Sequence, residues 1–299
     1  MINQPIIYTD LDGTLLDHYS YDFSAAIPAI EQLASLNIPV IANTSKTFAE
    51  LVNIQQTLGL NCPFICENGA AVYIPKGYFE LQPETTEEKG YYWVKTFSPA
   101  REHWLDLLAN QAAEFKNYYV GFSAMTVESL CSVTDLTPTK AKLALLREHT
   151  EPLLWLGNDL VKQQFTAKLQ SLGAEILQGG RFLHVGGKTN KAHAMNWLTH
   201  LYQQKIQQKS PQKVVQTIAL GDSGNDVAML NAADIAVQIK SPVHDFPALE
   251  TSALVIQSNQ FGPKGWAEAL QALLFDEPSL TNNNSSLDST SRTSNVLNA

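Results

Sequence analysis

The alternation of short apolar runs with helical segments near the N-terminus constrains the fold more than any other feature of this sequence. Residues 5–9, 38–42 and 64–66 are short and apolar, which is the pattern of strands buried in a parallel sheet. Residues 25–36 and 48–58 lie between them and carry apolar side chains at helical spacing. This order predicts an α/β fold with a doubly wound, Rossmann-like parallel sheet.

An insert interrupts the alternation. Beyond residue 82 the segments are longer and more aromatic. Helices and a hairpin are predicted there at residues 137–149, 159–172 and 174–185. The α/β pattern then returns, with elements predicted at residues 191–203, 214–220, 226–232, 235–237, 253–256 and 265–275. We therefore expect an α/β core of residues 1–82 and 187–275 and an α+β cap of residues 83–186. Residues 276–299 are Ser-, Thr- and Asn-rich, so a disordered tail is expected.

Charge and apolar content limit the classes of function. The chain has 299 residues, 44% of them hydrophobic, and a net charge of −9. A globular protein is expected, and a nucleic-acid binder is not, because phosphate backbones need a basic surface. No stretch reaches the ~18 apolar residues of a membrane helix, and the N-terminus lacks the basic region of a signal peptide, so we expect a cytoplasmic protein without a membrane partner. Cys62 and Cys66 lack the further ligands of a zinc site, which predicts free thiols.

Two carboxylates follow the first predicted strand, in the run Asp10-Leu11-Asp12-Gly13-Thr14. Open α/β sheets place their ligands at the carboxyl ends of strands. Phosphoryl transfer from a monoester needs an in-line nucleophile and a proton for the leaving oxygen. Asp10 can supply the nucleophile and form an aspartyl phosphate, and Asp12 can act as the acid and then the base. The alternative is a turn in which both aspartates merely accept hydrogen bonds from backbone amides.

Single groups elsewhere could serve the same chemistry. Thr44, after the second predicted strand, has a hydroxyl that can donate to a phosphoryl oxygen, although a helix N-cap explains it equally well. Lys191 begins a predicted helix, where a cation opposes the helix dipole, so a charge-stabilising role would account for its position. Lys188 is close by and equally basic, and periodicity does not choose between the two lysines.

The loop after the strand predicted at residues 214–220 is acidic. Its sequence is GDSGND, at residues 221–226, so that Asp222 and Asp226 lie four residues apart across a strand-to-helix turn. Mg²⁺ prefers hard oxygen ligands and is usually held by one or two carboxylates together with water and substrate phosphate. The loop therefore predicts a magnesium site. A capped helix start is the alternative, but it accounts less well for two aspartates and Asn225 packed together.

Taken in order, these segments resemble the haloacid dehalogenase superfamily, whose first signature is DxDGT and whose last is GDxxND. The resemblance implies a Mg²⁺-dependent phosphatase. The catalytic residues that it implies are Asp10 as the nucleophile, Asp12 as the acid and base, Thr44 as the phosphate-binding hydroxyl and Lys191 as the charge stabiliser. The metal site that it implies consists of Asp10, the Asp12 carbonyl and Asp222, with Asn225 and Asp226 in support.

The insert and several local strings narrow the resemblance. An α+β cap in this position, and ENGA at residues 67–70, are similar to the Cof-type branch. Strings that resemble mannosyl-3-phosphoglycerate phosphatases are TSKT at 44–47, GFS at 121–123, REHTEP at 147–152 and GPKGW at 262–266. A small phosphorylated sugar is the implied substrate, with the cap setting specificity. The substrate-binding residues expected on this basis are Lys46, Asn68, Ser123, Arg147 and Lys188. Arg147 could instead stabilise the end of a helix.

Four functions compete on this sequence. Hydrolysis of mannosyl-3-phosphoglycerate leads, followed by a Cof-type phosphatase for another sugar or polyol phosphate, including the glucosyl analogue. An isomerase is the third, because phosphomannomutases use the same paired aspartates to move phosphate between hydroxyls. The fourth is a phosphosugar-binding regulator, against which the intact Asp10, Asp12 and Asp222 speak. The sequence does not indicate an oligomeric state.

Overall fold

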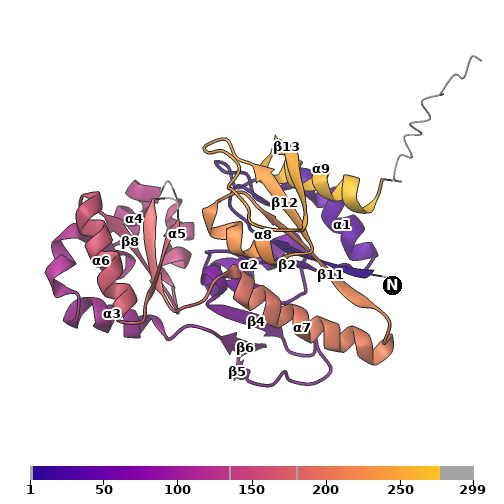
Figure 1. Cartoon of the computed structure of the whole chain (residues 1–299), viewed down its shortest axis with the longest axis horizontal. Coiled ribbons are helices and arrows are strands. Elements are labelled where there is room, and N and C mark those ends of the chain that lie inside the picture. The colour runs from indigo at the N-terminus through magenta and orange to yellow at the C-terminus, as the bar shows by residue number, and fades with distance from the viewer. Residues whose placement is uncertain (1–2, 135, 180, 277–299) are drawn as a thin grey trace, which may run out of the picture.

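The computed structural model describes residues 3–134, 136–179 and 181–276, which form the two lobes seen in Figure 1. The larger lobe contains a parallel sheet ordered β13-β12-β11-β1-β2. Its strands are β1 (Asn3–Thr9), β2 (Val40–Ala42), β11 (Val214–Gly221), β12 (Ile235–Lys240) and β13 (Leu254–Phe261). The chain leaves β1 toward β2 and returns on the other side at β11, so their carboxyl ends meet at a topological switch point, where such sheets bind ligands. The predicted α/β fold is confirmed.

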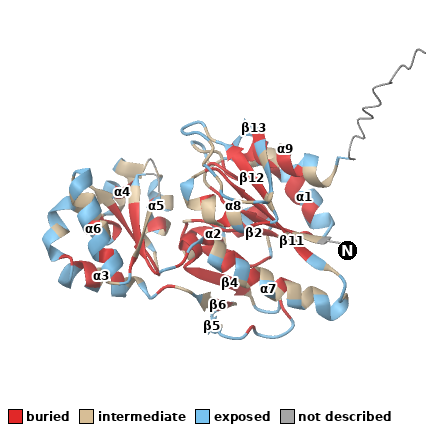
Figure 2. Ribbon diagram, in the orientation of Figure 1, coloured by how far each residue is buried: buried red, intermediate tan, exposed pale blue. Residues whose placement is uncertain are grey.

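Helices cover both faces of this sheet. Successive side chains of a strand point to opposite faces, so Ile7 of β1 packs toward α1, α2 and α9, whereas Ile6 and Tyr8 pack toward α7 and α8. These helices are α1 (Ile27–Ser35), α2 (Phe48–Leu58), α7 (Lys191–Lys209), α8 (Val227–Ala232) and α9 (Gly262–Leu274). The predicted helix 191–203 continues to Lys209. Buried residues concentrate in the strands and on the inward helix faces (Figure 2).

The larger lobe also contains a second sheet, ordered β3-β4-β6-β5, which packs against α7. Its strands are β3 (Phe64–Cys66), β4 (Ala71–Pro75), β5 (Glu87–Lys89) and β6 (Tyr92–Thr96). The third strand predicted at residues 64–66 is confirmed as β3, and its bridge to the residue after β2 is parallel. A tight turn at residues 67–69 reverses the chain, so β3 pairs antiparallel with β4. β3 reaches the parallel sheet through an isolated bridge between Asn43 and Ile65.

The smaller lobe is an antiparallel sheet, ordered β7-β8-β10-β9, with helices packed against both of its faces. Its strands are β7 (Tyr119–Gly121), β8 (Glu151–Trp155), β9 (Glu175–Gly179) and β10 (Phe182–Gly186). Its helices are α3 (Arg101–Asn110), α4 (Val127–Thr134), α5 (Pro138–Leu145) and α6 (Asp159–Ser171). Leu153, Leu183 and Val185 pack against α3 and α6. The hairpin predicted at residues 174–185 is confirmed.

The helix predicted at residues 137–149 is too long, because α5 ends at Leu145. The backbone amides of residues 148–150 donate to the carboxylate of Glu67 in the other lobe instead of continuing the helix. Arg147 therefore does not stabilise a helix end, which was the alternative considered for it.

Strand pairing bears on the division between the lobes. Residues 87–96 fall within the range expected for the cap, yet β5 and β6 extend the sheet of β4. We propose that the cap spans residues 98–186. Of the tail expected at 276–299, all but Asp276 lies outside the described residues. Among the residues that are described, Cys62 and Cys66 are buried free thiols, and the helices are too short or too polar to cross a bilayer.

Candidate active site

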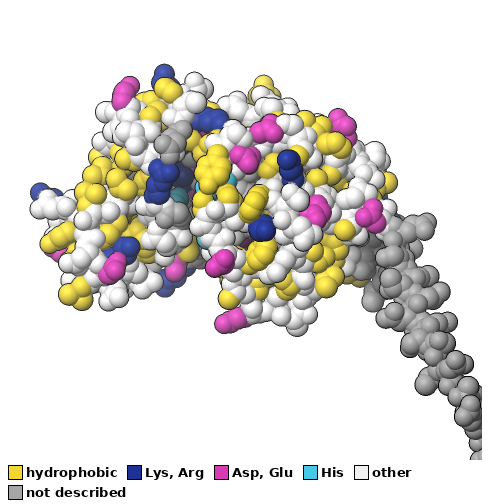
Figure 3. All heavy atoms as spheres, turned by 90° about the horizontal axis from the view of Figure 1, so that it is seen from above, with side chains coloured by type: hydrophobic (Ala, Val, Ile, Leu, Met, Phe, Trp, Pro, Cys, Tyr) yellow, Lys and Arg dark blue, Asp and Glu magenta, His cyan; other side chains and the backbone are white. Residues whose placement is uncertain are grey.

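A cleft of about 510 Å³ lies where the two lobes meet. The larger lobe contributes Asp10, Asp12 and Lys46 to its wall, and the smaller lobe contributes Arg147 and His184. Lys and Arg side chains gather at this junction in the space-filling view (Figure 3). The cleft lies at the carboxyl ends of β1 and β11, as the sheet topology predicts for a ligand site.

Asp10 and Asp12 follow β1 directly and face this cleft. The Asp10 side chain is almost buried, whereas that of Asp12 is 40% exposed. Gly13 then turns the chain with φ of +79°, and a Cβ at this position would lie 2.6 Å from Oδ2 of Asp222. Glycine therefore allows the turn after β1 to approach the loop after β11 closely.

Lys191, in the first turn of α7, is fully buried between two carboxylates. Its Nζ lies 2.6 Å from Oδ1 of Asp10 and 2.6 Å from Oδ1 of Asp226. Burial opposes its charge, but the two carboxylates outweigh burial and raise the Lys191 pKa, so the side chain stays protonated. Lys188, the alternative left open by the sequence, is exposed. The geometry therefore puts Lys191 beside Asp10.

Asp10, Asp222 and Asp226 form a buried acidic cluster, with one oxygen of each within 4.8 Å of the others. Burial raises the Asp10 pKa to about 7 although Lys191 opposes the shift. Burial, and then the charges of Asp226 and Asp10, raise the Asp222 pKa to about 8. Three carboxylates around one lysine leave an excess of negative charge, which protons or a hard cation can balance. This donor set fits Mg²⁺.

Asp226 has a supporting position within this cluster. Its Oδ2 accepts hydrogen bonds from the amides of Asp222 and Ser223 at 3.1 and 3.0 Å, while Oδ1 pairs with Lys191. Both oxygens are therefore engaged in shaping the acidic loop. The carboxylate of Asp222 is held by the Thr14 hydroxyl at 3.1 Å, which the sequence analysis did not single out.

Lys46 lies beside Asp12 in the cleft. Its Nζ is 2.8 Å from Oδ2 of Asp12 and 3.7 Å from Glu50, the residue that also completes the capping box of α2. The other oxygen of Asp12, Oδ1, is buried and has no partner among the described residues. Thr44 is buried behind this pair, and its hydroxyl accepts a hydrogen bond from the Lys46 amide at 3.3 Å, which leaves it a hydrogen to donate.

The cap presents two buried polar groups to the cleft. Arg147 donates from Nη2 to the Ser45 carbonyl at 3.1 Å, and its Nε has no partner among the described residues. His184 is likewise buried, and its Nδ1 has no partner in the described part of the chain. Burial, with a smaller effect from the Arg147 charge, lowers the His184 pKa to about 3. His184 is therefore neutral and was missed by the sequence analysis.

Other residues expected at the site have different surroundings. Asn68 is buried and accepts a hydrogen bond from Asn225 at 3.1 Å, and Asn225 is itself at the cleft wall. The amide of Ser123 donates to Glu151 at 2.8 Å, while the Ser123 side chain is exposed. The cleft wall, as far as the structure describes it, is formed without Asn68, Ser123 or Lys188.

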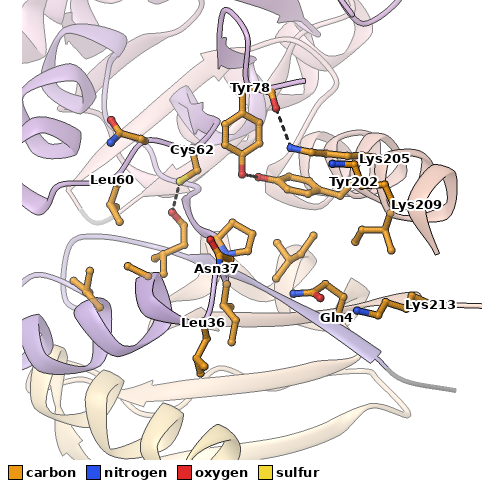
Figure 4. Close-up of a pocket in the computed structure, with 18 of the residues that line it drawn as sticks. Gln4, Leu36, Asn37, Leu60, Cys62, Tyr78, Tyr202, Lys205, Lys209 and Lys213 are labelled. Atoms are coloured by element: carbon orange, nitrogen blue, oxygen red, sulfur yellow. Dashed lines mark hydrogen bonds between the residues drawn. The ribbon is translucent and has the colours of Figure 1, made fainter. Parts of the chain in front are cut away.

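A larger hollow, of about 960 Å³, lies at the opposite end of the strands (Figure 4). In its lining, the Tyr202 hydroxyl donates a hydrogen bond to the Tyr78 hydroxyl at 2.7 Å, and Lys205 donates to the Tyr78 carbonyl at 2.9 Å. Lys205 and Lys209 belong to the end of α7, where cations offset the helix dipole. This hollow carries no carboxylate in its described lining, so the cleft is the candidate active site.

The comparisons with known proteins agree with this geometry. The profile of the haloacid dehalogenase-like hydrolase family matches residues 7–259. The chain belongs to this family.

Among its relatives are two proteins named glucosyl-3-phosphoglycerate/mannosyl-3-phosphoglycerate phosphatase. The one from Methanococcoides burtonii is 34% identical over 269 residues, and the one from Persephonella marina is 36% identical over 270 residues. Each alignment covers 90% of this chain and 97% of the relative. The recognition made from the sequence is confirmed.

Solved structures show the same fold at lower identity. A haloacid dehalogenase-like hydrolase from B. subtilis is 18% identical with a TM-score of 0.61, covering 90% of this chain and 99% of its own. The sucrose-phosphatase from Synechocystis is 17% identical with a TM-score of 0.54, covering 91% and 98%.

Proposed function

We propose that the chain is a Mg²⁺-dependent phosphatase that hydrolyses mannosyl-3-phosphoglycerate or its glucosyl analogue through an aspartyl phosphate on Asp10. The observation that carries the proposal is the pair Asp10 and Asp12 at the switch point of the sheet, beside Asp222 and facing a cleft closed by a cap. The names of relatives 34–36% identical over nearly their whole length support the substrate.

In the first step, a carboxylate oxygen of Asp10 attacks the phosphorus, and the bond from phosphorus to the ester oxygen breaks. The leaving oxygen takes its proton from Asp12. In the second step, Asp12 removes a proton from water, which attacks the phosphorus and releases inorganic phosphate and the Asp10 carboxylate. Lys46 lies 2.8 Å from Oδ2 of Asp12 and so fixes the orientation of this carboxylate at the cleft wall.

The surrounding groups balance charge during these steps. Lys191 neutralises part of the charge on Asp10 and on the transferred phosphoryl group, which the Thr44 hydroxyl would also contact. Mg²⁺ bound by Asp10, the Asp12 carbonyl and Asp222 would supply further positive charge to the phosphoryl oxygens. Asn225 and Asp226 would support the loop that carries Asp222.

Recognition of the rest of the substrate falls to the cap. A glycosyl-3-phosphoglycerate carries a carboxylate and sugar hydroxyls besides its phosphate. The unpartnered Nε of Arg147 suits the carboxylate, because an ionised pair forms a strong hydrogen bond. The unpartnered Nδ1 of the neutral His184 suits a hydroxyl. Lys46, already paired with Asp12, would contact the phosphate side of the substrate.

Phosphate release with Mg²⁺ across a panel of sugar phosphates tests the proposal. We expect preferential hydrolysis of mannosyl- or glucosyl-3-phosphoglycerate, and loss of turnover in Asp10→Asn without loss of the fold. Cleavage of other esters instead would keep the mechanism and reject the substrate. Substantial activity in Asp10→Asn would reject the nucleophile. Consumption of substrate without free phosphate would favour the isomerase.

A further inference from the structure

A left-handed turn after β3 lies between the two lobes. Glu67, Asn68 and Gly69 have φ values of 49°, 58° and 90° in succession. Two of these residues are not glycine, and such a backbone persists where its surroundings hold it in place. Glu67 is 1% exposed and Asn68 is 4% exposed, so both side chains are buried at the junction. Their contacts show what the turn holds.

The Glu67 carboxylate anchors the cap segment 148–150. Its Oε1 accepts the amide of Glu148 at 2.8 Å. Its Oε2 accepts the amides of His149 and Thr150 at 3.2 and 2.8 Å, and the Thr150 hydroxyl at 2.6 Å. Successive backbone N–H groups around one anion form a nest of the kind that binds free anions. Here the larger lobe supplies the anion, so Glu67 attaches the cap to the core.

Arg147 comes directly before the anchored segment and shares its hydrogen bonds. Its Nη1 donates to the Thr150 hydroxyl at 3.0 Å and lies 3.7 Å from Oε2 of Glu67. Because the same hydroxyl donates to Glu67, the three residues form one chain of hydrogen bonds. The Arg147 side chain is 6% exposed and has the Glu67 carboxylate beside it, so removing Glu67 would leave a buried cation with less compensation.

The neighbouring residues of the turn contact the catalytic loops. Oδ1 of Asn68 accepts the side-chain amide of Asn225 in the acidic loop at 3.1 Å. The Gly69 carbonyl accepts the hydroxyl of Thr189, two residues before Lys191, at 3.0 Å. One turn is therefore bonded to the cap, to the acidic loop and to the segment that leads into α7.

We propose that Glu67 is a positioning residue, which holds the Arg147 guanidinium at the cleft wall so that it meets a second anionic group on the substrate. The identity of that group as a carboxylate rests on the proposed function. Glu67 is too deeply buried to be offered to the substrate itself, and it acts through Thr150 and the amides of segment 148–150.

Steady-state kinetics of Glu67→Gln on two substrates test this inference. Glutamine keeps the size but loses the charge, and its NH₂ group would face one of the three amides. We expect kcat/KM for glucosyl- or mannosyl-3-phosphoglycerate to fall on the order of tenfold to a hundredfold, mainly through KM. The loss on p-nitrophenyl phosphate, which carries no carboxylate, is expected to be at least tenfold smaller. Glu88→Gln, the same change at an exposed ion pair with Lys76, is the control.

A double-mutant cycle with Arg147→Met shows whether Glu67 acts through the arginine. If it does, the variant with both changes loses no more on the carboxylate-bearing substrate than Arg147→Met alone. Additive losses, or equal losses of Glu67→Gln on both substrates, would overturn the proposal. If the wild-type enzyme prefers another phosphate ester, the proposed function fails, and the same cycle on that ester against p-nitrophenyl phosphate still decides the role of Glu67.

Thr150 provides a second variant in case Glu67→Gln does not fold. Thr150→Val breaks the chain of hydrogen bonds between Arg147 and Glu67 without removing a charge. We expect the same selective rise in KM, smaller in size, and recovery in Thr150→Ser, which restores the hydroxyl. An identical KM in Thr150→Val and Thr150→Ser would contradict the relay.

Discussion

Acid should destabilise this protein through His184. In the unfolded chain a histidine takes up a proton below about pH 6.5, but burial lowers the folded-state pKa of His184 to about 3. The unfolded state therefore binds more protons, and stability falls as pH decreases from 6.5 toward 3. For these two pKa values, the linkage relation gives a loss of about 2 kcal/mol in the free energy of unfolding between pH 7 and pH 5.

Urea denaturation of the wild type and of His184→Gln at pH 7 and pH 5 measures this loss. Other titrating groups contribute to both proteins, so the difference between their pH dependences isolates His184. We expect the variant to lose about 2 kcal/mol less than the wild type over this interval. His200→Gln, a change at an exposed histidine of α7, is the control and should keep the wild-type dependence. Equal losses in His184→Gln and the wild type would refute the assignment of a buried, neutral imidazole.

Three further perturbations address the acidic cluster. Lys191→Met leaves Asp10 and Asp226 buried without their cation, and we expect a loss of about 3–5 kcal/mol in the free energy of unfolding without Mg²⁺. A loss below about 1 kcal/mol is the size measured for exposed ion pairs, and it would contradict the buried pairing of Lys191. Mg²⁺ at about 100 times its Kd should stabilise the wild type by about 2.7 kcal/mol in thermal unfolding, and Asp222→Asn should lose most of this gain. Gly13→Ala forces a Cβ to within 2.6 Å of Asp222 at φ of +79°, so weaker Mg²⁺ binding by calorimetry is expected, and unchanged binding would contradict the close approach.

The parallel sheet and the catalytic carboxylates could be predicted because each depends on a short stretch of sequence. The strand that ends in Asp10 is an apolar run, and the acidic loop that contains Asp222 follows another. The rule that parallel strands end at one edge then brings the two loops together without further information. The 64–66 strand was predicted, but its antiparallel pairing with β4 was not, because that pairing depends on the turn that follows the strand. Nothing in a three-residue apolar run distinguishes a parallel neighbour from an antiparallel one.

The cap was harder to predict because its contacts join segments distant in sequence. Glu67 bonds to amides 81–83 residues away, and those amides end a helix that local propensity would continue to residue 149. Asn68 was expected to bind substrate because it lies in a family-like string, but its side chain bonds to Asn225. Resemblance of a short sequence to a family motif indicates that its residues lie near the active site. It does not indicate the direction in which each side chain points.

For His184, the sequence did contain a usable signal. On β10, Leu183 and Val185 point into the cap core, so Phe182 and His184 on the alternate positions must point to the other face. Part of that face, around Phe182, packs against α4 and α5, whereas His184 lies at the wall of the cleft between the lobes. A lone polar side chain on this face is buried when the lobes meet, which removes its water and lowers its pKa. His184 is buried, and its Nδ1 has no partner among the described residues. The alternation of side chains along the five residues of β10 was therefore enough to identify His184 as a candidate for binding substrate.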